Sequence, residues 1–470
     1  MTEISLSSID SIQQAPYLQT YPGDEYIGRT GSILLLITLF FVSAFSQIDR
    51  ILPFILAESI KADLRLSDTQ IGLLTGIAFA VCYALLSLPL ARASDRGSPR
   101  LVLVACIAIW SAMTALGGFA ASFLFLAFTR FGVAFGEAGA TPSAHALIAR
   151  KIRPERRGLA VGIFSMGIPI GTMVGFAAGG ALGDTLGWQT VLLGAGAVGG
   201  LLAVLVLAVA GPTPPLKTLK SASAGREPFL QSSLRLLSSP GFRWLFVGAV
   251  AAGFAGAPFY AFGAPFLMRT HGFSASQAGL AFGLLQGLMG VLGTLGGGRW
   301  FDRLVRAGHG RVLGPPAMLF LIASATMTAA LFTPVGWLSI ALMVPTMLSF
   351  SFLLPWSFGA SHLVAGKGNE GMASSLGMIG SGLLGPALGP LFVGMVSDAA
   401  TTARVPNGLA LGLLIVPVAS VLTGLAYLVA NRRIAAVLRT RAPPPGADPP
   451  VTEGQPVNRV PSAPCNHTPY

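Results

Sequence analysis

The sequence predicts an all-α polytopic membrane protein with twelve transmembrane helices in two pseudo-symmetric six-helix bundles. Three observations predict this fold: the composition, the number of apolar runs, and a charged turn that occurs twice. Of the 470 residues, 53% are hydrophobic and 10% are charged, and the mean hydropathy is +0.70. A soluble chain would carry roughly a quarter charged residues, so the bilayer is the solvent of this protein.

Apolar runs of about 20 residues, the length that crosses a bilayer, mark the expected helices. A polar segment at 1–30 precedes them, a polar linker at 211–242 divides them, and a proline-rich tail at 433–470 has the composition of a disordered segment. Two bundles at 31–210 and 243–432 follow from this division. The twelve predicted spans are 31–57, 69–91, 101–121, 123–149, 157–182, 188–210, 243–268, 275–298, 312–333, 336–362, 371–399 and 408–431.

The basic residues predict the orientation of the protein. If both termini are cytoplasmic, twenty-two Lys and Arg residues flank the spans on that side, and only four lie on the other: Lys61, Arg65, Arg269 and Arg404. Cytoplasmic loops carry such an excess, so we expect cytoplasmic termini in a bacterial inner membrane or a plasma membrane. The net charge of +12 is dispersed among short loops, which disfavours nucleic acid as a partner.

A charged turn repeats at the same place in each half. LARASDRGSPR follows the second span with Asp95 and Arg96, and GGGRWFDRLVR follows the eighth with Asp302 and Arg303. Duplicated halves indicate a transporter with its site between them.

At these turns the chain resembles the major facilitator superfamily, in which a glycine is followed four residues later by an aspartate and then a base. Gly298, Asp302 and Arg303 match this pattern, whereas the first copy has Ala91 in place of the glycine. The resemblance implies that Asp95, Arg96, Asp302 and Arg303 form a cytoplasmic gate that closes in the outward-facing state.

Within that superfamily the chain is more similar to the spinster family. That resemblance implies export of sphingosine-1-phosphate, a lysophospholipid or a related amphiphile. It rests on Asp49-Arg50, on DLRLSDTQIGLL at 63–74, on Trp110-Ser111, on Arg130 with Gly136-Glu137-Ala138 and Pro142, and on Gly167, Gly171, Gly175, Gly179 and Gly180.

Four ionisable residues lie inside predicted spans: Asp49, Arg50, Arg130 and Glu137. Each charge costs at least ~2.5 kcal/mol to insert, so intramembrane charges are functional hypotheses by default. Opposite charges suggest the pairs Asp49–Arg130 and Arg50–Glu137. Adjacent helical residues diverge by about 100°, so either Asp49 or Arg50 faces the cavity while the other packs against a helix. A cluster that only fixes helix packing is the structural alternative.

From these charges we expect Glu137 to be the principal proton-coupling carboxylate, with Asp49 as the second candidate. Arg50 and Arg130 are expected to pair with these acids or bind a substrate headgroup, because a guanidinium stays charged and binds phosphate or carboxylate in two places. Phe259, Tyr260 and Trp356 are candidates for an apolar cavity wall, although core or lipid-facing positions are the alternative. The glycine series at 167–180 is expected to allow close helix packing.

The expected function is proton-coupled, alternating-access export of an amphiphilic substrate. Alternatives are a broad-specificity drug or sugar porter of the same superfamily, or a passive lipid facilitator or scramblase. The sequence has no Walker loop, zinc-protease signature or nucleophile elbow, so we expect neither an enzyme nor a cofactor or metal site. The expected partners are the bilayer, a small amphiphile and protons, and the expected state is a monomer.

Overall fold

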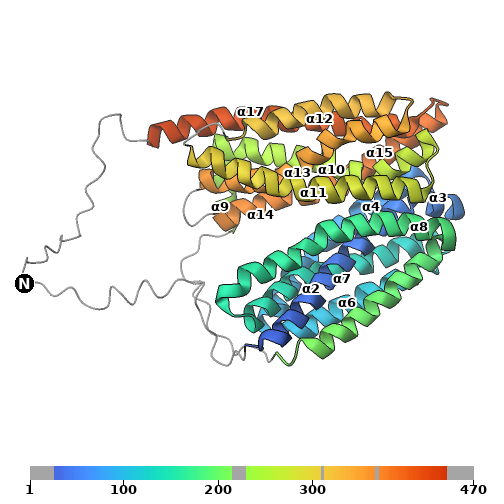
Figure 1. The fold of residues 1–470 in the computed structure, drawn as a ribbon. Helices are drawn as coiled ribbons and strands as arrows, with labels where there is room; N and C mark the ends of the chain where they lie inside the picture. The colour runs from blue at the N-terminus through green and yellow to red at the C-terminus, as the bar shows by residue number, and fades with distance from the viewer. Residues whose placement is uncertain (1–25, 214–228, 308–311, 366–369, 442–470) are drawn as a thin grey trace, which may run out of the picture.

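The computed structural model describes residues 26–213, 229–307, 312–365 and 370–441, and the regular elements within them are all helices. Figure 1 shows two bundles, one built from α2 to α8 and the other from α10 to α17. The all-helical, two-bundle fold predicted from the sequence is confirmed.

The N-terminal bundle contains a helix that is too long for one span. Its 56 residues would reach about 80 Å if straight, far beyond the ~30 Å hydrocarbon core. The backbone breaks at Gly187, where φ is 79° and ψ is 156°, so this helix is two spans. The eleven long apolar helices found among the described residues therefore account for twelve crossings. The helices are α2 (Arg29–Ile55), α3 (Ala57–Leu64), α4 (Asp68–Thr75), α5 (Ile77–Arg96), α6 (Pro99–Gly117), α7 (Phe123–Lys151) and α8 (Pro154–Val209).

The C-terminal bundle is also built from helices with interruptions. A π-helical turn, η2, separates α14 from α15, and such turns occur frequently at functional sites. The elements are α9 (Phe229–Ser238), α10 (Pro240–His271), α11 (Ala275–Arg306), α12 (Gly314–Phe332), α13 (Gly336–Ala365), α14 (Glu370–Ile379), η2 (Gly380–Leu384), α15 (Gly385–Thr402), α16 (Gly408–Leu413) and α17 (Ile415–Arg441).

Two predicted boundaries differ from the structure. The linker predicted at 211–242 includes α9 and the start of α10, and the tail predicted from 433 begins with the last turns of α17, which continues to Arg441. Arg432 and Arg433 end the apolar run without ending the helix, because arginine is a strong helix former. Residues 214–228 of the linker and 442–470 of the tail lie outside the described residues.

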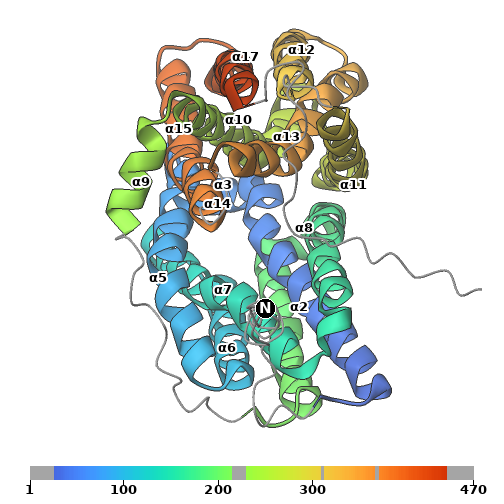
Figure 2. The same cartoon turned by 90° about the vertical axis from the view of Figure 1, so that its left-hand side faces the viewer.

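The most extensive contacts between the bundles are those of α8 with α11 and of α4 with α15. A Cβ at Gly72 would collide with the carbonyl of Pro390, and one at Gly279 with the carbonyl of Phe176, so both contacts require glycine. Figure 1 shows the bundles together near α3 and α4, which we call the closed end. They diverge toward the open end, where α9 and α14 lie (Figure 2).

The glycine series in α8 packs mainly within its own bundle. Gly167, Gly171 and Gly175 lie against α2, where added Cβ atoms would meet Ala44 or Ile48, and Gly180 alone of the series faces α11, at Ala275. Close helix packing by this glycine series is therefore confirmed. The packing holds α2, which carries Asp49 and Arg50, against α8.

Candidate functional site

A cavity of about 580 Å³ lies between the two bundles. Both of its charged lining residues, Arg50 and Arg130, come from the N-terminal bundle. The other polar residues are Gln47, Thr75, Tyr83 and Thr172 on that wall, and Tyr260, Gln286 and Ser381 on the C-terminal wall. The cavity therefore has one cationic wall and one largely apolar wall.

An ion pair joins α2 to α7 at the cationic wall. Arg50 donates from Nη2 and Nε to Oε2 of Glu137, at 2.6 and 3.0 Å. Glu137 is fully buried, whereas the Arg50 side chain is 32% exposed. The Arg50 guanidinium also lies 4.6 Å from the ring centre of Phe79 and 5.3 Å from that of Tyr83, within the range of cation–π attraction. The pairing of Arg50 with Glu137 expected from the sequence is present.

Asp49 faces the other way. Its Oδ2 accepts a 2.6 Å hydrogen bond from Thr114 on α6, it is only 1% exposed, and it does not line the cavity. Asp49 and Arg130 attract each other electrostatically, but they form no close ion pair among the described residues, where Oδ1 of Asp49 and Nε of Arg130 have no hydrogen-bond partner. The 100° divergence along α2 therefore places Arg50 at the cavity and Asp49 against α6.

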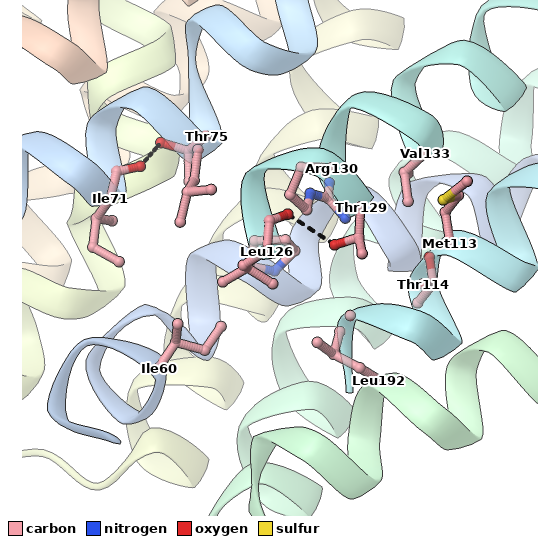
Figure 3. A pocket seen from close by; sticks show the side chains of 13 residues that line it. Ile60, Ile71, Thr75, Met113, Thr114, Leu126, Thr129, Arg130, Val133 and Leu192 are labelled. Carbon is pink, nitrogen blue, oxygen red and sulfur yellow. Dashed lines mark hydrogen bonds between the residues drawn. The ribbon is translucent and has the colours of Figure 1, made fainter. Parts of the chain in front are cut away.

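Arg130 also lines a second, smaller pocket inside the N-terminal bundle, shown in Figure 3. Its volume of about 20 Å³ is enough for one water molecule. The Thr129 and Thr75 hydroxyls in this pocket donate to carbonyls of their own helices, at 2.8 and 2.9 Å. Arg130 thus lines both the pocket and the central cavity, and its Nε is buried without a hydrogen-bond partner among the described residues.

Of the three aromatic candidates, only Tyr260 lines the cavity. Phe259 is fully buried against Phe282, with ring centres 5.0 Å apart, and Trp356 is fully buried against Phe301 at 5.3 Å. As cavity residues, Phe259 and Trp356 are wrong predictions. Neighbouring helical residues cannot share one face, so Tyr260 takes the cavity and Phe259 the core.

The four residues of the expected cytoplasmic gate lie at the open end. Asp95, Arg96, Asp302 and Arg303 are all exposed, and no ion pair joins them across the bundles in the part of the chain that the structure describes. A gate that closes only in the outward-facing state would be open in a structure whose bundles diverge at this end. Their role stays a prediction.

The closed end carries an ion cluster that the sequence interpretation missed. Arg269 of α10 binds Glu58 with Nε at 2.7 Å and Asp68 with Nη1 at 2.7 Å. Lys61 and Ser397 also bind Asp68, at 2.5 and 2.6 Å. The cluster joins the two bundles. Lys61 and Arg269 are two of the four basic residues that the sequence predicts on the non-cytoplasmic side. Their scarcity on that side was the sequence signal for the ion cluster.

Carboxylates also cap two helices across the bundle interface. Asp398 accepts from the backbone N–H groups of Asp68 and Thr69, both at 2.9 Å, at the start of α4. Asp184 accepts from the backbone N–H and the hydroxyl of Ser276, both at 2.7 Å, at the start of α11. A carboxylate is stabilising at a helix N-terminus. The repeat of SDTQIG at 67–72 as SASQAG at 274–279 is the sequence signal for this contact.

Two bundles around a central cavity, closed at one end and divergent at the other, define a membrane transport protein. A family model of the Major Facilitator Superfamily matches residues 35–390. The chain belongs to this superfamily, whose members are transporters and not enzymes.

Known proteins support the narrower resemblance. An MFS-type efflux pump of Mycolicibacterium smegmatis is 35% identical over 403 residues, covering 83% of this chain and 91% of the relative. Protein spinster homolog 1 of Xenopus tropicalis is 26% identical over 406 residues, covering 80% and 75%. A solved bacterial homolog of the human lysosomal transporter Spinster, inward-facing and unoccupied, superimposes with a TM-score of 0.74 at 28% identity, covering 88% and 98%. The chain therefore resembles the spinster family.

Proposed function

We propose that this chain exports an amphiphilic, lipid-like substrate, such as a lysophospholipid or sphingosine-1-phosphate, in a proton-coupled, alternating-access cycle. The observation that carries the proposal is the Arg50–Glu137 ion pair, which lies at the cationic wall of a cavity whose opposite wall is largely apolar.

The shape and chemistry of the cavity suit a molecule with a head and a tail. A volume of about 580 Å³ lies within the range of small-molecule sites. Arg50 and Arg130 offer charged donors for an anionic head. Phe350, Leu353 and Met378 on the other wall offer apolar surface for a chain.

The ion pair supplies a route to coupling. A carboxyl group buried in apolar surroundings favours its neutral form, whereas a neighbouring guanidinium favours the carboxylate. An anionic head that binds Arg50 competes with Glu137 for the guanidinium, so Glu137 becomes free to take a proton. Asp49 is the second candidate, but it is held by Thr114 away from the cavity.

We further propose that the open end faces the cytoplasm, with both termini on that side. The excess of basic residues at that end supports this orientation, as does the similarity to a transporter solved in an inward-facing state. The structure is then an inward-facing one, and the ion cluster of the closed end lies on the outer side of the membrane.

Transport by purified protein in liposomes tests the coupling. Glu137→Gln mimics the protonated residue permanently, so it should abolish transport driven by an imposed pH gradient and spare counterflow without a gradient. Glu155→Gln, which removes an exposed carboxylate from the first turn of α8, is the matched control. Full gradient-driven transport by Glu137→Gln, with loss in Asp49→Asn, would transfer the role to Asp49.

A second candidate is efflux of diverse drug-like compounds, favoured by the similarity to an efflux pump. Saturable, gradient-driven uptake of ethidium, with no competition by lysophosphatidate, would favour it over the amphiphile exporter. Lipid movement that neither saturates nor responds to the gradient would instead indicate a passive facilitator.

A further inference from the structure

Gln286 of α11 is a buried polar residue in the C-terminal wall of the cavity. It is only 4% exposed, and its Nε2 has no hydrogen-bond partner within the described residues. A buried amide without a partner destabilises a protein, and a leucine of similar volume would avoid this penalty. The Nε2 of Gln286 therefore needs a hydrogen-bond acceptor, and a bound molecule can supply one.

The other polar side chains of that wall are already engaged. Ser381 donates its hydroxyl to the carbonyl of Gly377 at 3.0 Å, and the Tyr260 hydroxyl lies 3.8 Å from the sulfur of Met347. Among the described residues of the C-terminal wall, Gln286 is thus the one that lines the cavity, is buried and has a side-chain nitrogen without a hydrogen-bond partner.

The position of Gln286 also favours contact with a bound molecule. Gly283 and Gly287, on either side of it, pack against Met173 of α8, so α11 approaches the N-terminal bundle closely at this level. Arg50 and Arg130 line the same cavity from that bundle. A substrate whose head binds either arginine would therefore occupy the same cavity as Gln286.

We propose that Gln286 is a specificity-determining residue that hydrogen-bonds a second polar group of the substrate, next to its anionic head. This inference rests on the proposed function and narrows its substrate class. The preferred amphiphile has an ester, hydroxyl or amide beside the charged head, and a bare alkyl anion is a poorer ligand.

Binding measured in nanodiscs, without a pH gradient, tests this residue. Palmitoyl lysophosphatidate and hexadecyl phosphate share a phosphate and a sixteen-carbon chain, but only the first has an ester and a hydroxyl beside the phosphate. Gln286→Leu should reduce the preference for lysophosphatidate about three- to tenfold, the range for one hydrogen bond, and should leave hexadecyl phosphate binding unchanged. Gln286→Met serves as a second variant if the leucine protein does not fold.

Gln231→Leu, which removes an exposed glutamine from α9, is the matched control and should keep the preference. An unchanged preference in the Gln286 variants, or an equal loss for both ligands, would overturn the role of Gln286 and leave the exporter proposal standing. If neither amphiphile binds the unmodified protein, the proposed substrate class fails and this inference fails with it.

Discussion

Each half of the molecule closes the cavity with the same contact, but only one of the two copies also carries an ion cluster. Gly180 and Asp184 of α8 meet the start of α11, and Gly394 and Asp398 of α15 meet the start of α4. Both recipient helices begin with a capping box, Ser67 with Gln70 and Ser274 with Gln277. A glycine that allows close approach and a carboxylate four residues later form the repeated unit.

The copies differ at the residue that follows the capping serine. It is Asp68 in α4 and Ala275 in α11. Asp68 is 1% exposed and binds Arg269, Lys61 and Ser397, whereas Ala275 has no side chain for such bonds. The shared backbone contact explains why the bundles meet, and the ion cluster adds a charge-dependent contribution on one side only.

The largest loss of transport is expected from substitution of the glycines at which the two bundles meet, in either half of the molecule. Gly72→Val and Gly279→Val place a side chain against a carbonyl of the other bundle, and backbone cannot move aside as a side chain can. Each should prevent closure and cut transport in liposomes about tenfold or more, since overpacking costs ~1–3 kcal/mol or more. Gly290→Val, in open space on the same helix α11, is the control. Transport near normal in either glycine variant would show that this contact is dispensable.

The next largest effect is expected in the copy that carries the ion cluster. Arg269→Gln leaves Asp68 without its strongest partner, and breaking a buried pair costs ~3–5 kcal/mol. The Arg269 side chain is 24% exposed, so about 1–3 kcal/mol against closure is expected. Spin labels at Leu186 and Val405, exposed residues of opposite bundles, should report a larger distance by double electron–electron resonance. Arg404→Gln, an exposed base at the same end, should leave the distance unchanged; an equal shift there would contradict the ion-cluster role.

A smaller difference separates the two caps. Asp398→Asn removes a charge from a cap that accepts three hydrogen bonds and adjoins Asp68. It should weaken closure by roughly 0.5–2 kcal/mol, the range for helix caps. Asp184 is exposed to solvent, so Asp184→Asn should cost less, about 0.3–1 kcal/mol. The same pair of spin labels measures both variants, and an equal or larger shift for Asp184→Asn would remove the proposed asymmetry.

The smallest effect on this conformation is expected at the open end. Asp302 is exposed and has no ion pair within the described residues, so Asp302→Ala should change the thermal stability by no more than about 0.5 kcal/mol. Because the gate residues are expected to act in the opposite conformation, turnover in liposomes should still fall. Stability lost together with turnover would show that Asp302 supports the present state instead.

Part of the site was predictable because the bilayer makes charges conspicuous. Asp49, Arg50, Arg130 and Glu137 stood out against their apolar spans, and charge balance was enough to suggest the Arg50–Glu137 pair. Gln286 did not stand out, because a neutral amide lacks the charge that marks the other four residues, and its unpaired Nε2 is recognised only from the three-dimensional structure.

The sequence by itself determined the membrane class, the twelve spans and the repeated halves, because hydrophobic length and duplicated turns are local properties. Only the tertiary structure decided which of two adjacent residues faces the cavity: Arg50 instead of Asp49, and Tyr260 instead of Phe259. It also decided that Arg269, 201 positions from Asp68 in the chain, becomes its partner. Such choices depend on helix rotation and on the packing of one bundle against the other, and neither is encoded in the spacing of residues along one helix.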